Sequence, residues 1–475
     1  MKREGHTRTL TATAFWMIIL SLSTGCLGEN ANGKTDPGAS NPGAEVRVKD
    51  QACAAVSCDE LADPGCAERN QTTCACGTDF VGRYVDGHCQ PLVPLETRKD
   101  PGSMEEYGAT VGMNGEVAVV GAPYGLNDRG EHSGAVYVFE LSMSGIWTQV
   151  ARLTPSDGRQ GDRFGAALAA DGDLILVGAP LHAAPPVQRA GAAYLFRRTA
   201  EGWQEEQQLT AFDGPKDEQF GSAVALSPLA LAVGAPLDDT PAGKDAGSVY
   251  VFERRGHSLG NSTKLLALQG RAYDNFGGAL AGDSLRILVG APGDDLAGDN
   301  AGAAYLYTRT ENGLWDPTRI SPALPAANGL FGSALAMRGD TLLIGASGET
   351  AGSAGRAGAA YIVERGTGRW DQITRLVAPD PRAGAGFGAS VAVADGLALI
   401  GACADQGPEK GCVGSGVAIA SRASTGWQPR GRLTSPQGKG IGKAISLSGQ
   451  SALIALSEDA TPGYGDSTLF VGSIE

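Results

Sequence analysis

The stretch FGAALAADGDLILVGAP, residues 164–180, contains the pattern that decides the fold. Small residues follow an aromatic-glycine pair, Asp171-Gly172 comes next, and the apolar run LILV follows it. Two short β-compatible runs around an Asp-Gly pair are typical of a tight β-hairpin. Pro180 cannot donate a hydrogen bond to a sheet, so the second strand is expected to end there.

The same pattern returns at regular intervals along the chain. An aromatic-glycine pair, or isoleucine-glycine in the last case, opens each unit, at Tyr107, Phe164, Phe220, Phe276, Phe331, Phe387 and Ile441. Successive openings are 54 to 57 residues apart, which indicates a repeat architecture of seven units. The Gly-Ala-Pro sequence ends the hairpin in the first four units and is altered in the later ones.

Each unit carries signals for two more strands. A third strand is predicted around a tyrosine in five units, namely Tyr137, Tyr194, Tyr250, Tyr305 and Tyr361, and a fourth begins near a tryptophan in most units. Four antiparallel strands per unit predict an all-β fold, a seven-bladed β-propeller over residues 92–475. The last unit lacks a fourth strand, so the segment LVPLET, residues 92–97, is expected to complete that blade.

The aromatic-glycine openings and Gly-Ala-Pro motifs resemble FG-GAP repeats, which occur in the head of integrin α chains and in many bacterial surface proteins. The resemblance implies the propeller fold, whereas it says much less about function. Integrin-type repeats often hold Ca²⁺ in a D-x-D-x-D-G loop between the first two strands. Turns such as Asn114-Gly115 are too short for that cage, so we do not expect Ca²⁺ at these turns, and no other cofactor is expected.

The N-terminal residues are typical of an export signal. Lys2 and Arg3 precede a short apolar run, and the sequence LSTG leads into Cys26. This resembles a bacterial lipoprotein signal over residues 1–25, with Cys26 as the lipidated residue, although Ser23 stands where such signals usually have leucine. Ordinary secretion with cleavage nearby is the alternative. Residues 26–50 are rich in Gly, Asn, Pro and Asp and are predicted to form a flexible tether.

The cysteines support an oxidising compartment. A cluster in residues 51–91 comprises Cys53, Cys58, Cys66, Cys74, Cys76 and Cys89, and Cys403 and Cys412 are expected to form a separate disulfide. The sequence CACGTDFVGRYVDGHC resembles an EGF-like module. The resemblance implies pairing of 53 with 66, 58 with 74 and 76 with 89, whereas the spacing alone leaves other pairings open.

The sequence contains no recognisable catalytic set. Its five histidines are scattered, and His-Glu-x-x-His is absent. Residues 28–35 match a phosphate-loop pattern, but they lie in the tether rather than between a strand and a helix. The net charge of −14 disfavours nucleic acid as a partner. We therefore expect a protein that is not an enzyme, with an extracytoplasmic enzyme whose site lies at the propeller axis as the alternative.

Acidic residues gather in the loops that follow Gly-Ala-Pro and in those that precede the openings. Asp294, Asp295 and Asp299 form the first candidate metal site, and a solvated acidic rim is the alternative. Both sets of loops belong to one face of a propeller, the face that integrin-like heads use for partners. Variable loops on a rigid scaffold suit binding.

We therefore expect a lipid-anchored protein of the outer membrane or cell surface. Its propeller head is expected to recognise a protein or a glycan, and an envelope scaffold without a specific ligand is a further alternative. The tripeptide Arg338-Gly339-Asp340 occupies the first hairpin turn of the fifth unit. Its glycine suits a tight turn, so we interpret the tripeptide as part of the fold rather than as an adhesion ligand.

Overall fold

A computed structural model describes residues 82–85, 88–91, 93–94, 105–128, 131–187, 189–214, 217–256, 258–402, 416–433, 441–457 and 467–473. The predicted signal, the tether, Cys26 and every disulfide partner except Cys89 lie outside these residues. Two compact units make up the chain, one of Met1–Phe80 with Tyr84–Gln90 and one of Val81–Arg83 with Pro91–Glu475. At the end of the predicted EGF-like module, β1 (Gly82–Val85) pairs with β2 (His88–Pro91) in a two-stranded sheet.

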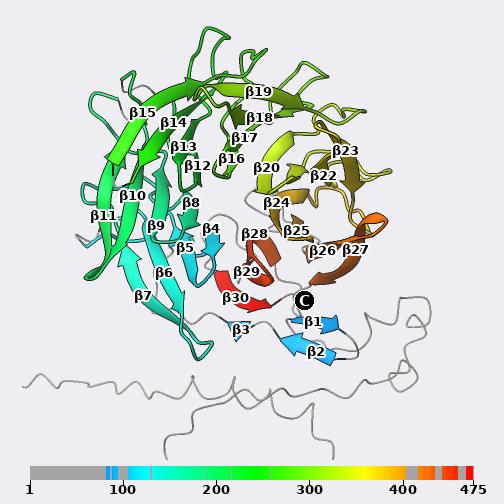
Figure 1. The fold of residues 1–475 in the computed structure, drawn as a ribbon, viewed down its shortest axis with the longest axis horizontal. Coiled ribbons are helices and arrows are strands. Elements are labelled where there is room, and N and C mark those ends of the chain that lie inside the picture. Colours follow the sequence, from blue (N-terminus) through cyan, green and yellow to red (C-terminus); the bar gives the residue numbers. More distant parts are fainter. Residues whose placement is uncertain are drawn as a thin grey trace, which may run out of the picture. The chain divides into compact units, whose positions relative to one another are not determined.

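The second unit is an all-β propeller in which no described residue is helical (Figure 1). Six of its sheets each contain four antiparallel strands that are consecutive in the chain. We number these sheets blades 1 to 6. Blade 1 has β4 (Thr110–Asn114), β5 (Val117–Ala122), β6 (Ala135–Leu141) and β7 (Trp147–Leu153), and blade 2 has β8 (Ala167–Asp171), β9 (Leu174–Ala179), β10 (Ala192–Thr199) and β11 (Gly202–Leu209).

The other four complete blades repeat this order. Blade 3 has β12 (Ala223–Leu226), β13 (Ala230–Ala235), β14 (Ser248–Arg255) and β15 (Ser258–Leu265), and blade 4 has β16 (Ala279–Gly282), β17 (Arg286–Ala291), β18 (Ala303–Arg309) and β19 (Trp315–Ile320). Blade 5 has β20 (Phe331–Arg338), β21 (Thr341–Ala346), β22 (Ala359–Arg365) and β23 (Trp370–Leu376), and blade 6 has β24 (Phe387–Ala394), β25 (Leu397–Ala402), β26 (Gly416–Ala423) and β27 (Gly426–Leu433).

The predicted number of seven blades needs correction, because six sheets of four consecutive strands follow the repeat, whereas the expected N-terminal strand does join the last sheet. The remaining sheet joins β28 (Ile441–Ser448), β29 (Ser451–Ser457) and β30 (Ser467–Ser473) to β3 (Val93–Pro94). β3 pairs antiparallel with β30, with Val93 opposite Val471, and it is shorter than the expected segment 92–97. This sheet is therefore a composite of two distant parts of the chain, and it packs beside β4 and β24.

The two repeated glycines explain how neighbouring blades approach each other. A Cβ atom on Gly178 of β9 would lie 2.0 Å from the carbonyl oxygen of Gly221, which opens the next blade. Gly221 itself has φ +97°, which side chains other than glycine rarely adopt. The same contact recurs from Gly234 to Gly277. Both glycines are thus required because two backbones meet there.

The opening aromatics form the core of each blade. Phe164 packs edge-on against Tyr194 with 5.5 Å between ring centroids, and Phe276 packs in the same way against Tyr305. These four rings are fully buried. Such edge-to-face pairs add to the stability that apolar burial provides. The sequence motif therefore supplies one ring, and the third strand supplies its partner.

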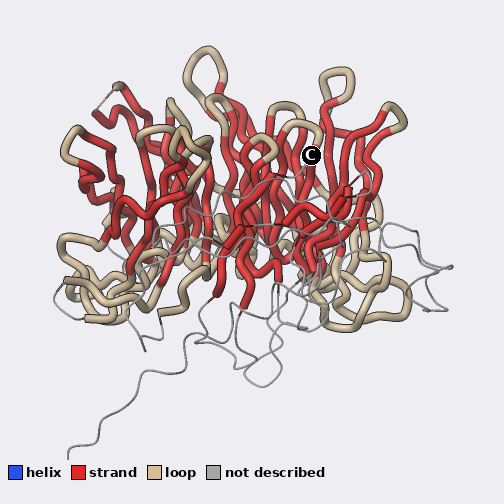
Figure 2. Tube along the Cα trace, turned by 90° about the horizontal axis from the view of Figure 1, so that it is seen from below, coloured by secondary structure: helices blue, strands red, loops and turns tan. Residues whose placement is uncertain are grey.

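The strands of the propeller run between two faces with different connections (Figure 2). We define the turn face by the turns inside the hairpins, such as residues 115–116 and 172–173. We define the loop face by the loops between second and third strands and by the connections between blades, such as residues 180–191 and 210–222. Among the described residues, no helix is long and apolar enough to cross a membrane.

Candidate functional site: buried acids on the loop face

On the loop face, the third-strand tyrosine in each of blades 1 to 5 donates a hydrogen bond to a carboxylate, and this carboxylate is buried in blades 1, 3, 4 and 5. In blade 4, Tyr305 Oη donates to Asp294 Oδ2 at 2.7 Å, and Arg319 Nη2 lies 2.8 Å from Asp294 Oδ1. Asp294 is only 1% exposed. Burial, and then the hydrogen bond to Asp294, raises the pKa of Tyr305, so the phenol keeps its proton. Tyr305, Asp294 and Arg319 therefore form a triad in which one arginine neutralises one buried acid.

Blade 5 repeats this triad with glutamate as the acid. Tyr361 Oη donates to Glu349 Oε2 at 2.6 Å, and Arg375 Nη2 lies 2.6 Å from Glu349 Oε1. In blade 1, Tyr137 Oη donates to Glu105 Oε2 at 2.7 Å, and burial raises the pKa of this tyrosine to about 12. The cation position of blade 1 is Arg152.

Blade 2 contains a histidine between two aspartates. His182 Nδ1 lies 2.9 Å from Asp162 Oδ2, and His182 Nε2 lies 3.6 Å from Asp157 Oδ2. Tyr194 Oη donates to Asp157 Oδ1 at 2.7 Å. The fourth strand supplies Gln208, whose amide also donates to Asp157. The only side chain of this group that can become positively charged is therefore His182.

Blade 3 buries two acids, Asp238 and Glu218, and its fourth strand supplies a lysine. Lys264 Nζ lies 2.6 Å from Asp238 Oδ2 and 2.7 Å from Asp213 Oδ2. Tyr250 Oη lies within hydrogen-bond distance of Asp213 and of Glu218. Burial, and then the adjacent charge of Asp238, raises the pKa of Glu218 to about 8. Glu218 therefore holds a proton at neutral pH.

A second acid is also buried in blade 4. Asp274 lies two residues before the opening aromatic, at the position that Glu105, Asp162 and Glu218 occupy in blades 1 to 3. Burial, and then the charge of Asp294, raises the pKa of Asp274 to about 6, although the backbone N–H of Arg271 donates to it. Within the described part of the chain, Asp274 Oδ1 has no hydrogen-bond partner. The equivalent residue in blade 5 is Gly329.

The structure separates the three residues of the predicted metal site. Asp294 points inward to Arg319, whereas Asp295 is exposed and accepts a hydrogen bond from the backbone N–H of Asn300 at 2.5 Å. Asp299 is exposed as well. Among the described residues, no group of three or more His, Cys, Asp or Glu side chains is placed to share a metal ion. The arginine supplies the positive charge that an ion would bring to Asp294.

The alternative of a solvated acidic rim is wrong for several of its members. Asp162, Asp238, Asp274 and Asp294 are at most 2% exposed, because they lie beneath the loops rather than on them. The sequence pattern placed the tyrosines in the third strands but did not pair them with these acids. The sequence does contain a repeated pattern that could have indicated these buried polar groups. A polar residue follows the hairpin glycine by four positions in blades 2 to 5, at His182, Asp238, Asp294 and Glu349.

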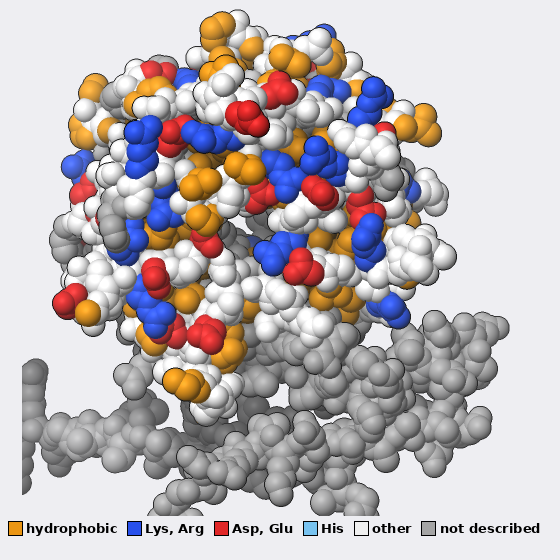
Figure 3. All heavy atoms as spheres, viewed as in Figure 1, with side chains coloured by type: hydrophobic (Ala, Val, Ile, Leu, Met, Phe, Trp, Pro, Cys, Tyr) orange, Lys and Arg blue, Asp and Glu red, His pale blue; other side chains and the backbone are white. Residues whose placement is uncertain are grey.

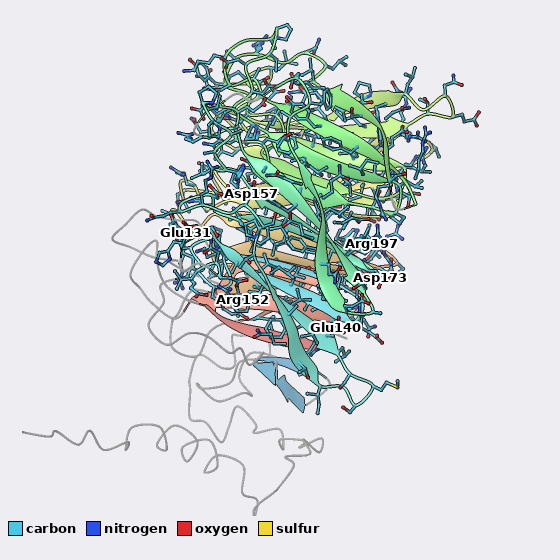
Figure 4. All side chains as sticks on the ribbon, turned by 90° about the vertical axis from the view of Figure 1, so that its left-hand side faces the viewer. Glu131, Glu140, Arg152, Asp157, Asp173 and Arg197 are labelled. Atoms are coloured by element: carbon cyan, nitrogen blue, oxygen red, sulfur yellow. The ribbon has the colours of Figure 1, made fainter. Side chains whose placement is uncertain are left out.

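Two open clefts flank the connection between blades 1 and 2. One, of about 330 Å³, is lined by residues including Asn127, Arg152, Ser156 and Trp203. The other, of about 380 Å³, is lined by residues including Arg159, Asp162 and Arg189. Figure 4 shows that Glu131, Arg152 and Asp157 lie at one end of the strands of blades 1 and 2. Glu140, Asp173 and Arg197 lie at the opposite end. Residues 154–162 therefore present side chains to both clefts.

The turn face is fastened by ion pairs between neighbouring blades. Glu140 of blade 1 contacts Arg198 of blade 2 at 2.6 Å, and the equivalent pairs are Glu253–Arg309 at 2.6 Å and Glu364–Arg422 at 2.8 Å. On the face seen in Figure 3, basic and acidic side chains alternate, so no large patch carries a single charge. These contacts link blades 1 to 2, 3 to 4 and 5 to 6.

The Arg338-Gly339-Asp340 tripeptide belongs to this set of contacts. Arg338 Nε lies 3.1 Å from Asp395 Oδ1 of blade 6, and Asp340 Oδ1 lies 3.0 Å from Arg286 Nη1 of blade 4. Gly339 has φ +55° in a turn whose added Cβ would meet no atom, so backbone conformation rather than space favours glycine. Both charged side chains thus contact adjacent blades.

Comparison with known proteins agrees with this architecture. The family model for the FG-GAP repeat matches residues 97–139, 147–196, 203–252, 260–307, 318–363 and 370–418, which is more than half of the chain. The chain belongs to the FG-GAP repeat family. Integrin alpha-2 from Bos taurus is 31% identical over 205 residues, a match that covers 37% of this chain and 16% of the integrin.

The FG-GAP chain thus spans less than a fifth of that integrin's length in the matched region. The crystal structure of Sqt1 from Chaetomium thermophilum is similar with a TM-score of 0.44 and 12% identity, over 78% of this chain and 87% of that chain. The six matched segments end in the third strands of blades 1 to 6, and each of the last five begins in the fourth strand of the preceding blade. The composite sheet lies outside them.

Proposed function

We propose that this FG-GAP protein is a non-enzymatic binding protein of the cell surface, and that its loop face recognises a protein or a glycan. The observation that carries the proposal is the contrast between the two faces. Ion pairs between blades fasten the turn face, whereas the loop face carries the longer connections and both clefts beside residues 154–162. The resemblance to integrin heads, which serve adhesion, supports the same face.

The proposal extends to the parts outside the described residues. An exported chain anchored through Cys26, with the EGF-like module as a spacer, would hold the propeller away from the membrane. The composite sheet of β28, β29, β30 and β3 would act as a seventh blade and close the ring. Radioactive palmitate labelling of the full chain and of Cys26→Ser tests the anchor, and equal labelling of the two would contradict it.

The binding face is tested with matched tryptophan substitutions of exposed residues. Gln160→Trp places a large side chain beside the second cleft, and Ser144→Trp places the same side chain in the hairpin turn between β6 and β7. The full chain is first screened against arrays of glycans and extracellular proteins. Gln160→Trp is expected to weaken binding of any ligand found by at least about tenfold, or ~1.4 kcal/mol. An equal effect of Ser144→Trp would contradict the choice of face.

A further inference from the structure

Blade 3 differs from the other complete blades in the cation of its fourth strand. The residue before the final apolar position is arginine in blades 1, 4, 5 and 6, at Arg152, Arg319, Arg375 and Arg432, and it is Gln208 in blade 2. Blade 3 alone has a lysine there, Lys264. A primary amine can form an amide with a carboxyl group, whereas the guanidinium of arginine stays charged and serves as an ion-pair partner.

The lysine is held against a carboxyl group that water does not reach. Lys264 Nζ lies 2.6 Å from Asp238 Oδ2, and Asp238 is fully buried. The ring of Tyr250 covers the ammonium group, with 4.8 Å from Nζ to the ring centroid. Reacting groups held in contact, away from solvent, gain a large effective concentration.

Two further carboxyl groups are placed to move the protons that such a reaction needs. Asp213 Oδ2 lies 2.7 Å from Lys264 Nζ and is partly exposed. Glu218 is 1% exposed and lies beside Asp238, whose charge helps to keep Glu218 protonated at neutral pH. The cluster therefore contains an amine, a buried electrophilic carboxyl, a proton acceptor and a proton donor.

We propose that Lys264 and Asp238 condense into an intramolecular amide bond, with Asp213 as the proton acceptor and Glu218 as the proton donor. The ammonium of Lys264 first gives one proton to Asp213. Glu218 then protonates one oxygen of the Asp238 carboxylate, and the free amine attacks Asp238 Cγ, so that the C–N bond forms in a tetrahedral intermediate whose protonated oxygen is the leaving group. The amine loses its second proton to that oxygen, water departs, and one proton remains shared by Asp213 and Glu218.

The equilibrium of the first step leaves only a small fraction of Lys264 as free amine, which lowers the rate of the reaction. Burial lowers the pKa of Lys264, but the hydrogen bonds to Asp213 and Asp238 outweigh that effect and raise it, so the ammonium form predominates. The amide should therefore form slowly after folding. The bond would tie the loop before β14 to β15 at the edge of the blade, beneath the loop face. This inference does not depend on the proposed binding function.

Blades 4 and 5 serve as internal controls. Arg319 lies 2.8 Å from Asp294, and Arg375 lies 2.6 Å from Glu349, in the same arrangement of third-strand tyrosine and buried acid. These pairs should remain ionic, so only one cross-link is expected among the described blades.

Peptide mapping of the folded full chain tests the proposal directly. The aged protein is denatured, reduced and digested with trypsin. An amide at Lys264 blocks cleavage there, so segment 256–271 should remain whole and joined to segment 217–244, with a total mass lower by one water molecule. Fragmentation must place the link between Lys264 and Asp238, which distinguishes it from a cyclic imide at Asp238 alone.

Two variants identify the roles of the other groups. Lys264→Arg should keep an ion pair and yield only separate peptides, and Glu218→Gln should slow formation of the branched peptide by at least about tenfold, consistent with the loss of one proton donor. Recovery of linear segments 256–264 and 217–244 from the aged wild type, in the same yield as other tryptic peptides, would overturn the proposal. That result does not depend on whether either variant folds.

Discussion

Blades 4 and 5 are neighbours with the same triad, but they differ in the number of acids that they bury. Tyr305, Asp294 and Arg319 in blade 4 correspond to Tyr361, Glu349 and Arg375 in blade 5. Blade 4 adds Asp274, whereas blade 5 has glycine at that position. One arginine balances one buried acid, and the second acid has to keep a proton until the pH rises. Of these two blades, only blade 4 therefore holds a buried acid with a raised pKa two positions before the opening aromatic.

Removing the arginine should produce the largest difference between the two blades. In Arg319→Met, Asp294 stays buried without its cation. This is expected to lower the free energy of unfolding by on the order of 3–5 kcal/mol. Arg375→Met should cost less, because the side chain of Arg375 is 42% exposed and water can reach its acid more easily. Urea unfolding of both variants checks this order, and equal losses would show that exposure does not distinguish the two triads.

The second acid of blade 4 should make stability depend on pH. Because the pKa of Asp274 is about 6 in the folded chain and about 3.9 when exposed, the folded state binds more protons between these values. Its contribution is thus most favourable at low pH, is lost as the pH rises toward 6, and stays lost above it.

Asp274→Asn tests this dependence, since an amide can still accept the hydrogen bond from the N–H of Arg271. The variant should melt at a higher temperature than the wild type at pH 7. The corresponding difference in the free energy of unfolding, roughly 3 kcal/mol, should become small near pH 4. Comparing wild type with variant at each pH removes the contribution of all other groups. A difference that is constant from pH 4 to pH 7 would contradict the assignment.

Removal of the tyrosine hydroxyl should have a smaller effect. Tyr305→Phe and Tyr361→Phe each remove one donor to a buried acid that retains its arginine, at a cost of about 1–2 kcal/mol. We expect the larger loss in blade 4, where the side chain of Asp294 is 1% exposed against 9% for Glu349. Chemical unfolding of the two single variants measures both values, and a larger loss in blade 5 would reverse the comparison.

Removal of ion pairs on the turn face should have the smallest effect on the free energy of unfolding. Arg338→Ala and Asp340→Ala remove exposed pairs, which typically contribute less than about 1 kcal/mol. Neither variant should change the attachment of integrin-bearing cells to a surface coated with the protein. Loss of attachment with both variants, and not with Arg309→Ala on the same face, would restore the adhesion-ligand interpretation.

The repeat motif predicted the blades because its constraints are local. A tight turn needs Gly172, and the close approach of two backbones needs Gly178 and Gly221, so the sequence carries these requirements directly. The family match confirms the FG-GAP repeats in six blades. The sequence predicts seven blades, whereas six sheets of four consecutive strands follow the repeat. The expected completion of the last unit by an N-terminal segment is confirmed by the pairing of β3 with β30.

The buried acids could not be predicted in the same way. Asp294 and Arg319 are 25 residues apart and meet only because the loop after β17 folds over the end of β19. Acidic residues in loops are ordinarily solvated, so spacing alone gave no reason to bury Asp274. The ion pair between Glu140 and Arg198 was more accessible to prediction, because the two residues occupy adjacent positions in the third strands of successive blades.

The pairing of β3 with β30 has a consequence for the order of synthesis. These strands are separated by nearly the whole propeller, so the composite sheet cannot form before β30 has left the ribosome. Blades 1 to 6 can each assemble from consecutive strands as they emerge, whereas β3 must wait for its partner. A chain that stops early would keep six blades and leave β3 unpaired, and a protease that cuts near β3 would therefore distinguish interrupted chains from those that have reached β30.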